Sequence, residues 1–312
     1  MLTPTAAAFL LLVLSAPFDG YQLESVPTGK LYWKGWSTAD RERMAALLPR
    51  ALDEVEVRLG RKLDRPFIAV LAPDGFELRR LVEGLSGSHW RPPVPESVLG
   101  IALPEAGVLI LRGGYSTAGG FDTTLLHEVA HLVIHRLPER RIPRWFDEGV
   151  AQWVSRASLS SGDESYMSFL ARIGAIYPLG SLNRSLPEAY EPTTIAYQES
   201  LLLVHFLAER HGDEVVPRLL DGFETGAATA AVFQGVLGEA PEKVEESFRS
   251  WLVARRSLPS ALVSILNIWT ISALVALVAI VRFSIRSRRR LARMDEEEET
   301  EDEEGGKAST GT

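Results

Sequence analysis

The sequence of 312 residues contains no cysteine. A disulfide framework, a thiolate metal site, a cysteine nucleophile and a lipid-modified N-terminal cysteine are therefore excluded. Basic residues are fewer than acidic ones. The sequence has 33 Lys and Arg and 41 Asp and Glu, which gives a formal charge of -8. Nucleic-acid binding depends on clustered Lys and Arg, so this balance argues against a nucleic-acid partner. With 46 % hydrophobic residues, the chain is long enough for one large or two small domains.

Residues 261–281 form a run of 21 residues without a charged side chain. As a helix this run would be about 30 Å long, which matches the apolar thickness of a bilayer. The run therefore predicts a transmembrane helix, and a fully buried core helix is the alternative. Six arginines lie between residues 282 and 293, whereas three lie just before the run. The positive-inside rule then places the C-terminus in the cytoplasm and the preceding domain outside.

The two ends of the chain also indicate a location at the cell membrane. Residues 6–14 form an apolar stretch of signal-peptide length, followed by small residues, which predicts a signal peptide over residues 1–16. No Lys or Arg precedes this stretch and Pro17 follows it, so an uncleaved anchor or a buried segment stays open. Residues 282–312 are first basic and then acidic, and from residue 295 onward their composition cannot bury a core. We expect them to form a disordered cytoplasmic tail, whose partner the sequence does not indicate.

The candidate folded domain, residues 21–256, begins with mixed α/β sequence and continues with helical sequence. Apolar spacing predicts helices over residues 40–59 and 76–85, and short apolar runs predict strands over residues 67–71 and 108–111. After residue 120 the pattern predicts helices only, over residues 123–136, 144–156, 195–211, 215–223 and 241–254. The expected fold class is therefore α+β, with a mixed α/β N-terminal part, a helical C-terminal part and one C-terminal transmembrane helix.

The candidate chemistry lies in residues 127–131, which fit the pattern H-E-x-x-H. Apolar neighbours give this segment a helical face, and in a helix His127 and His131 project from the same side. Both imidazoles can then bind one Zn²⁺ at about 2.0–2.1 Å. Glu128 lies beside the first ligand, so it can accept a proton from a zinc-activated water and later pass it to the leaving amine.

A second predicted helix supplies a third ligand for the same ion. This helix begins after Pro143, and Glu148 lies 17 positions beyond His131. A catalytic zinc site has three protein ligands and an open position for water, so Glu148 completes the set. Gly149 is expected to let the two zinc-binding helices approach closely.

These residues resemble the gluzincin zinc metallopeptidases, in particular the peptidase MA-like group, in which H-E-x-x-H is followed by W-x-x-E-G-x-A. The matching residues are His127, Glu128, His131, Trp145, Glu148, Gly149 and Ala151. The resemblance covers residues 100–255, strongly at the zinc motif and weakly elsewhere. It implies a zincin-like catalytic domain with a thermolysin-like active-site subdomain, one Zn²⁺ and a peptide or protein substrate. The rival metzincin pattern does not fit, because Ile134 and Leu137 occupy its glycine and third histidine positions.

Three further residues are candidates for supporting roles, and a third histidine on the same helix is excluded from the zinc site. Tyr197 resembles the tyrosine with which many gluzincins stabilise the oxyanion of the tetrahedral intermediate, and a packing role is the alternative. Gln152 is predicted to lie on the ligand face of its helix, whereas Asp147 is predicted to point about 100° away; either can support a zinc ligand or lie at the surface. His135 lies about 6 Å farther along its helix than His131, too far to bind the same ion.

The sequence thus predicts a membrane-anchored zinc metallopeptidase that hydrolyses peptide bonds with a metal-activated water. The aminopeptidase element G-x-M-E-N is absent, which slightly favours an endopeptidase. Residues 108–111 are then a candidate edge strand that binds an extended peptide, and an ordinary core strand would look the same. The alternative function is a catalytically silent zinc-binding module that acts as a membrane-anchored binding or sensor protein. Glu128 argues against it, because a structural zinc site has four protein ligands and no use for a base.

Overall fold

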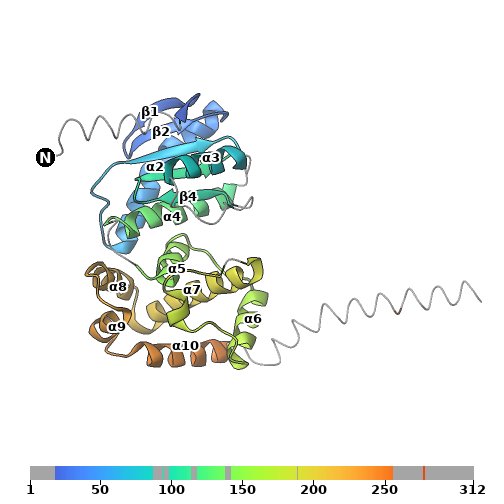
Figure 1. Ribbon diagram of the computed structural model, residues 1–312, viewed down its shortest axis with the longest axis vertical. Coiled ribbons are helices and arrows are strands. Elements are labelled where there is room, and N and C mark those ends of the chain that lie inside the picture. The colour runs from blue at the N-terminus through green and yellow to red at the C-terminus, as the bar shows by residue number, and fades with distance from the viewer. Residues whose placement is uncertain are drawn as a thin grey trace, which may run out of the picture. The chain divides into compact units, whose positions relative to one another are not determined.

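The computed structural model describes residues 18–86, 94, 98–113, 118–137, 142–187, 189–255 and 277 (Figure 1). Residues 22–112 contain a five-stranded sheet. Its strands are β1 (Gln22–Val26), β2 (Gly29–Trp33), β3 (Phe67–Ala72), β4 (Gly100–Leu103) and β5 (Val108–Arg112). Their order in space is β1-β2-β3-β5-β4; β2, β3 and β5 run parallel, whereas β1 and β4 are antiparallel to their neighbours.

The strand β4 forms one edge of this sheet, and β5 lies between β3 and β4. The prediction that residues 108–111 form an edge strand is therefore wrong, because they belong to the interior strand β5. The four residues of β4 read Gly-Ile-Ala-Leu and follow a proline-rich stretch, so they show no alternation long enough to detect. β4 packs beside α4 (Ala118–Ile134), the helix that carries the H-E-x-x-H motif.

Helices cover both faces of the sheet. Alternate residues of a strand point to opposite faces, so each face buries its own set of side chains. Val70 and Ile110 point to one face, where they are buried in one cluster with residues of α3 (Gly75–Ser86). Leu71 and Leu111 point to the other face, where they join residues of α2 (Thr38–Leu59) and α4. This second cluster continues into the helical part of the chain, so one core supports both parts.

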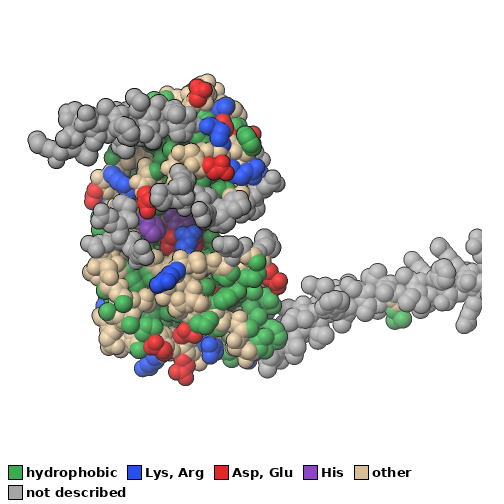
Figure 2. Space-filling model, in the orientation of Figure 1, with side chains coloured by type: hydrophobic (Ala, Val, Ile, Leu, Met, Phe, Trp, Pro, Cys, Tyr) green, Lys and Arg blue, Asp and Glu red, His purple; other side chains and the backbone are tan. Residues whose placement is uncertain are grey.

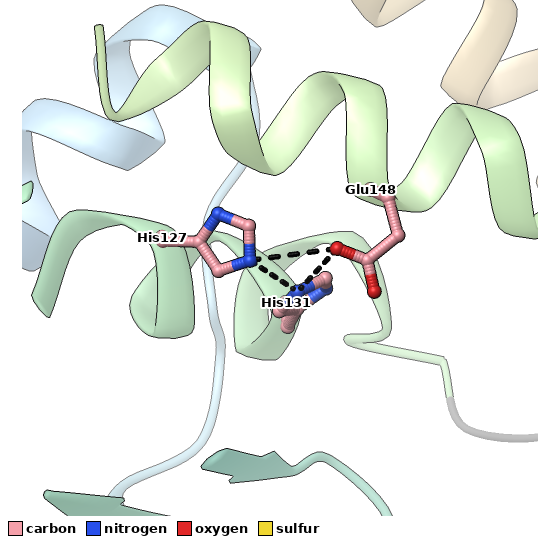
Figure 3. Close-up of side chains that lie close together, drawn as sticks. All are labelled: His127, His131 and Glu148. Atoms are coloured by element: carbon pink, nitrogen blue, oxygen red, sulfur yellow. Dashed lines mark hydrogen bonds and ion pairs between the residues drawn. The ribbon is translucent and has the colours of Figure 1, made fainter. Parts of the chain in front are cut away.

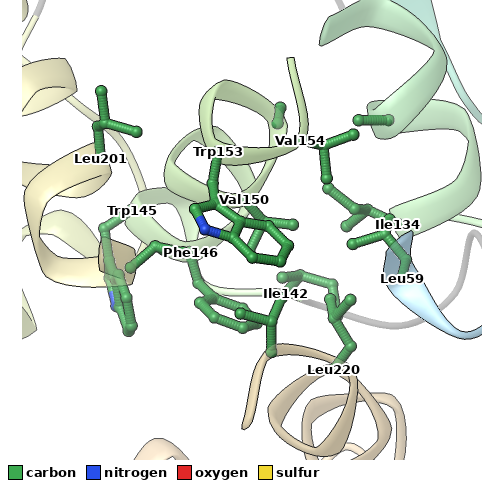
Figure 4. Packing of buried hydrophobic residues seen from close by; sticks show 14 of the residues in the cluster. Leu59, Ile134, Ile142, Trp145, Phe146, Val150, Trp153, Val154, Leu201 and Leu220 are labelled. Atoms are coloured by element: carbon green, nitrogen blue, oxygen red, sulfur yellow. The ribbon is translucent and has the colours of Figure 1, made fainter. Parts of the chain in front are cut away.

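The helical part begins with α5, which Figure 1 shows next to α4. Its elements are α5 (Arg144–Val154), α6 (Ser161–Arg172), the 3-10 helix η3 (Leu179–Leu182), α7 (Tyr190–His211), α8 (Val215–Glu224), α9 (Thr229–Leu237) and α10 (Pro241–Arg255). Nine of the eleven residues of α5 are buried. Its Phe146 and Trp153 side chains lie among apolar residues of α2, α4 and α8 (Figure 4). Because α5 is packed on most sides, the side chains that it directs toward α4 are held in fixed positions.

The structure confirms the predicted succession of a mixed α/β part and a helical part. Every helix and strand predicted within the domain is present, and its ends lie within five residues of the predicted ones. The elements β1, β2, β4, α6, η3 and α9 were not predicted.

Within the described ranges, no helix is both long enough and apolar enough to cross a bilayer. The predicted signal peptide, transmembrane helix and cytoplasmic tail lie outside the described residues, apart from the single residue Leu277.

Candidate active site

The three predicted zinc ligands lie together, although they come from two different helices (Figure 3). His127 and His131 project from successive turns of α4, and their Nε2 atoms are 3.2 Å apart. Glu148 projects from α5, and its Oε2 lies 3.5 Å from Nε2 of His127 and 3.7 Å from Nε2 of His131. The close packing of α4 and α5 therefore brings the predicted donor atoms to one point.

The spacing of these donor atoms fits one zinc ion. Tetrahedral ligands at bonds of 2.0–2.1 Å lie about 3.3 Å from one another, close to the three separations observed here. Oε2 of Glu148 is also completely buried and has no hydrogen-bond partner among the described residues. A buried carboxylate oxygen without a partner is costly, and a bound cation removes that cost. The donor set, two imidazoles and one carboxylate, is that of a catalytic zinc site with a free fourth position.

The other oxygen of Glu148 has two partners. The hydroxyl of Tyr197, on α7, donates a hydrogen bond of 3.1 Å to Oε1. The guanidinium of Arg144, one turn earlier on α5, forms an ion pair with the same atom. Burial would raise the pKa of Glu148, but Arg144 and His131 outweigh it and lower the pKa to about 2. Glu148 is therefore held as a carboxylate that offers Oε2 alone to a metal.

Asp147 holds His131 in the orientation that a ligand needs. Its Oδ1 lies 2.7 Å from Nδ1 of His131, and Arg144 donates a hydrogen bond of 2.8 Å to its Oδ2. A carboxylate only accepts hydrogen bonds, so Nδ1 carries the proton and Nε2 is left free to face the metal. Nε2 of His135 lies 3.2 Å from the same Oδ1. His135 thus contacts Asp147 and not the zinc-ligand group, as its position along the helix predicted.

Of the two predicted supporting residues, Asp147 contacts a predicted ligand and Gln152 does not. Nε2 of Gln152 donates hydrogen bonds of 3.1 Å to the backbone oxygens of Glu148 and Tyr197, so it joins α5 to α7 and contacts neither imidazole. Asp147 points in a different direction from Glu148, but both can contact His131 because the imidazole ring has a nitrogen on each of two sides. Asp147 faces Nδ1 and Glu148 faces Nε2.

Gly149 provides a close approach, but to a different helix from the one predicted. A Cβ atom at this position would lie 2.4 Å from the backbone oxygen of Ser200 and 2.8 Å from Cγ2 of Val204. Both residues belong to α7. Gly149 therefore sets the distance between α5 and α7, which carries Tyr197, and not the distance between α4 and α5.

The predicted base, Glu128, lies between α4 and the edge strand β4. The backbone N–H of Ala102 donates a hydrogen bond of 2.7 Å to its Oε2, and a Cβ on Gly100 would lie 2.8 Å from its Cγ. Leu99 accepts a hydrogen bond from Arg112 of β5, so by antiparallel alternation Gly100 and Ala102 direct their polar groups to the free edge. Sequence reasoning missed this contact because it missed β4.

A pocket of about 350 Å³ opens at this point, and Figure 2 shows His side chains at the surface there. Its lining combines the edge strand, α4, the end of α5 and α7: Val98, Leu99, Gly100, Thr123, Thr124, His127, Glu128, Ser155, Ala157 and Tyr197. The first ligand, the predicted base and the predicted oxyanion donor therefore face one space. Arg144 was not predicted, although its spacing of three and four residues before Asp147 and Glu148 is the signal for such ion pairs.

Comparison with solved structures finds M1 zinc metallopeptidases. The enzyme from Deinococcus radiodurans is 17 % identical, with a TM-score of 0.40 over 77 % of this chain and 53 % of that chain. A two-domain M1 zinc metallopeptidase mutant bound to L-arginine is 16 % identical, with a TM-score of 0.38 over 74 % of this chain and 51 % of that chain. This chain thus spans about half the length of these structures. No curated protein matches it.

The sequence also matches a known protein family. Residues 95–254, which are 160 of the 312 residues, match the Peptidase MA superfamily. The matched range contains the whole donor set, the predicted base, β4 and every helix from α4 to α10. The chain belongs to the Peptidase MA superfamily.

Proposed function

We propose that this protein is a membrane-anchored zinc peptidase that hydrolyses peptide bonds, with endopeptidase action slightly favoured. The observation that supports this most is the pocket that His127, Glu128 and Tyr197 line together. Nε2 of His127 lies 3.5 Å from Oε2 of Glu148, the oxygen without a hydrogen-bond partner. A metal site, a carboxylate base and a hydroxyl donor around one space are the parts that peptide hydrolysis needs.

In the proposed reaction, His127, His131 and Glu148 would hold the zinc ion. When bound, zinc would lower the pKa of a water and polarise the peptide carbonyl. Glu128 would accept a proton from the attacking water as its oxygen bonds to the carbonyl carbon, and would pass that proton to the leaving amine as the C–N bond breaks. The N–H of Ala102 fixes Oε2 of Glu128, so the proton moves through Oε1, the other oxygen of the carboxylate.

We propose that, when substrate is bound, the hydroxyl of Tyr197 leaves Oε1 of Glu148 and donates its single hydrogen bond to the oxyanion of the tetrahedral intermediate, while Arg144 keeps its ion pair with Oε1. The hydroxyl of Tyr197 lies beside Glu148 and its side chain lines the pocket. Burial and the negative charge of Glu148 raise the pKa of Tyr197 above its usual value. The hydroxyl therefore keeps its proton at neutral pH and remains a donor.

The described lining of the pocket disfavours an acidic part of the substrate. Among the described residues that line it, Glu128 is the only charged side chain, and its neighbours include Val98, Thr124 and Ala157. A substrate carboxylate there would face Glu128, with no cationic side chain in this lining to pair with it. We therefore expect little cleavage next to acidic side chains.

Membrane anchoring is part of the proposal and rests on the sequence. The apolar run at residues 261–281 and the arginines after it support a single membrane span with the C-terminus in the cytoplasm. The peptidase domain would then lie outside the cytoplasm, where its substrates would be peptides or proteins of that compartment.

A catalytically silent zinc-binding module remains the competing function, and one experiment separates the two. The full chain and its Glu128→Gln variant are compared for bound zinc and for cleavage of an unstructured protein. We expect both to hold one zinc ion and only the wild type to cut, with the variant at least about 100-fold slower, because it lacks the base. A chelator should abolish the cleavage.

The mode of cleavage is measured in the same assay. A peptide with an acetylated N-terminus and an amidated C-terminus should be cut internally, since an endopeptidase needs neither terminus. Zinc bound equally by both forms without any cleavage would support the silent module, and absence of zinc from both would contradict either function.

A further inference from the structure

The outer face of α6 is apolar where a surface helix is normally polar. Tyr166, Phe169 and Ile173 follow one another at helical spacing on this face. Tyr166 is 38 % exposed and Ile173 is 59 % exposed, whereas Phe169 is partly buried. Figure 2 shows hydrophobic side chains gathered over α6 at the lower right of the molecule. We call these three residues the α6 face.

The surroundings of the α6 face are poor in charge. Arg172 is the only charged residue between residues 165 and 183, in a chain with 24 % charged residues. Its guanidinium donates a hydrogen bond of 2.6 Å to the backbone oxygen of Val253, on α10, so it turns inward. Exposed Ala175 and Pro178 extend the apolar surface beyond the end of the helix. The α6 face is therefore part of a continuous apolar area rather than a single exposed side chain.

The α6 face also lies beside the point where the chain leaves the domain. α6 packs along α10, and Arg255, the last residue of α10, forms an ion pair of 3.3 Å with Glu164 of α6. Five residues, 256–260, separate Arg255 from the apolar run at residues 261–281. Fully extended, the six steps from Arg255 to residue 261 span no more than about 22 Å. A membrane that contains the apolar run must therefore lie within this distance of the end of α10.

We infer that the α6 face rests on the lipid surface of the membrane in which residues 261–281 are anchored. The inference rests on the membrane anchoring of the proposed function and goes beyond it, because an anchored domain could equally stand free in water. Tyrosine is favoured at the boundary between headgroups and acyl chains, and an exposed isoleucine gains by entering the apolar region below. The three side chains of the α6 face are uncharged, so the contact depends on apolar side chains and needs no anionic lipid.

The absence of cysteine allows a direct test with single spin labels on the full chain. The label is placed at Ile173→Cys on the α6 face, at Val57→Cys as a matched control, and at Ala273→Cys within the apolar run. Val57 is also an exposed aliphatic residue, 79 % exposed, but lies on α2. The protein is inserted into nanodiscs of phosphatidylcholine. Collisions of each label with oxygen, which enters lipid, and with a nickel chelate, which stays in water, are then measured.

We expect nickel collisions at residue 173 to be several-fold fewer than at residue 57, with oxygen collisions retained. A second measurement places the label at Tyr166→Cys and adds Ile173→Asp, which should restore nickel collisions because the charge cannot enter the lipid. Neither site is buried, so both variants are expected to fold.

The other outcomes are distinct from one another. If the label at residue 273 lies in lipid but the label at residue 173 meets nickel as often as the control, the domain stands free and this inference is wrong while anchoring stands. If the label at residue 273 is itself in water, anchoring fails and the inference fails with it. Shielding at residue 173 together with spin–spin broadening between copies would assign the α6 face to self-association and overturn the lipid contact.

Discussion

The two oxygens of Glu148 show how finely the site depends on single side chains. Oε1 is held by Tyr197 and Arg144, whereas Oε2 faces His127 and His131 without another partner. A ligand carboxylate that is fixed by one oxygen binds a metal through the other. Glu148 is therefore expected to be a ligand through one oxygen, and the groups that hold Oε1 become important for metal affinity.

Replacing Arg144 with glutamine should weaken zinc binding by about 10- to 100-fold, the usual effect of removing a partner of a ligand. The change removes the cation beside Glu148 and the donor to Asp147. Competition with a coloured chelator measures the affinity. Arg43→Gln is the control, because it removes only a surface ion pair with Asp122. Equal affinity of the two variants would mean that Arg144 has no part in holding Glu148.

Glu199 is a second buried carboxyl, outside the metal site. It lies on α7, is 4 % exposed and accepts a hydrogen bond of 3.0 Å from the backbone N–H of Tyr177. Burial raises its pKa to about 8; the hydrogen bond from Tyr177 and the charge of Arg249 oppose this rise, and Glu245 adds to it. The folded state therefore prefers the protonated acid. This contribution to stability is complete below the unfolded pKa of 4.5 and is lost as the pH rises to 8.

The variant Glu199→Gln should remove this pH dependence. Between pH 5.5 and 8, the stability of the wild type should fall relative to the variant by up to about 3 kcal/mol, at about 1.4 kcal/mol per pH unit. Urea unfolding at several pH values measures the difference. Glu42→Gln, an exposed position, should run parallel to the wild type. Parallel profiles for Glu199→Gln as well would show that the buried carboxyl does not titrate in this range.

At the scale of single residues, spacing was enough to predict which three donor side chains lie together, but not the groups that support them. His127, Glu128 and His131 lie in one pattern, and Glu148 follows 17 residues after His131, on the next predicted helix. The contacts of Asp147 depend on the angle between α4 and α5, and the contact of Ala102 with Glu128 depends on the pairing of β4. Neither can be read from local periodicity, because both arise from tertiary packing.

At the scale of single elements, the position of α5 depends on its close approach to α7. The backbone of α7 passes so near Gly149 that there is no room for a methyl group. This proximity lets Gln152 join the two helices and brings Tyr197 to Glu148. α5 and α7 therefore have to be regarded as one unit that presents the third ligand.

The variant Gly149→Ala should destabilise the protein by about 1–3 kcal/mol or more, the cost of overpacking a buried helix contact. It should also weaken zinc binding, because Glu148 is the adjacent residue. Thermal unfolding and zinc titration measure the two effects. Gly235→Ala, within α9, is the control; its Cβ would meet no atom within 4 Å, so helix propensity should make it neutral or stabilising. A Gly149→Ala protein as stable as the control would contradict the close approach.

The elements that sequence analysis missed have physical reasons for being missed. α6 has a capping box formed by Ser160 and Asp163, which is a start signal, but its exposed face is apolar and so gives a weak amphipathic pattern. α9 is short and mostly small or apolar, with two large residues, Val232 and Phe233, buried. β1 and β2 each have five residues and are half-exposed. In each case packing against neighbours, rather than local sequence, decides the structure.

At the scale of the domain, the donor set joins the two parts of the fold. α4 packs on the sheet, whereas α5 belongs to the helical part. A zinc ion held by His127, His131 and Glu148 would therefore link these parts directly. Binding to the folded state alone stabilises it according to the ratio of zinc concentration to Kd.

Removal of zinc should lower the melting temperature of the whole domain in one transition. At a free zinc concentration of about one thousand times Kd, the stabilisation is about 4 kcal/mol, or on the order of 10 °C. Thermal unfolding with zinc and with a chelator measures this shift. Glu128→Gln should keep the full shift and His131→Ala should lose it. A shift in His131→Ala equal to that of the wild type would place the stabilising ion elsewhere.

The contact between Glu128 and Ala102 has a consequence for handling the protein. An open strand edge is a template on which another chain can add, and β4 is such an edge. Because Glu128 accepts the outward N–H of Ala102, the predicted base also closes one position of this edge against aggregation. The variant Glu128→Ala would leave that N–H without this acceptor, whereas Glu128→Gln keeps a side-chain oxygen that can accept the hydrogen bond. An inactive form meant for trapping substrates should therefore carry glutamine if it is to stay free of aggregates.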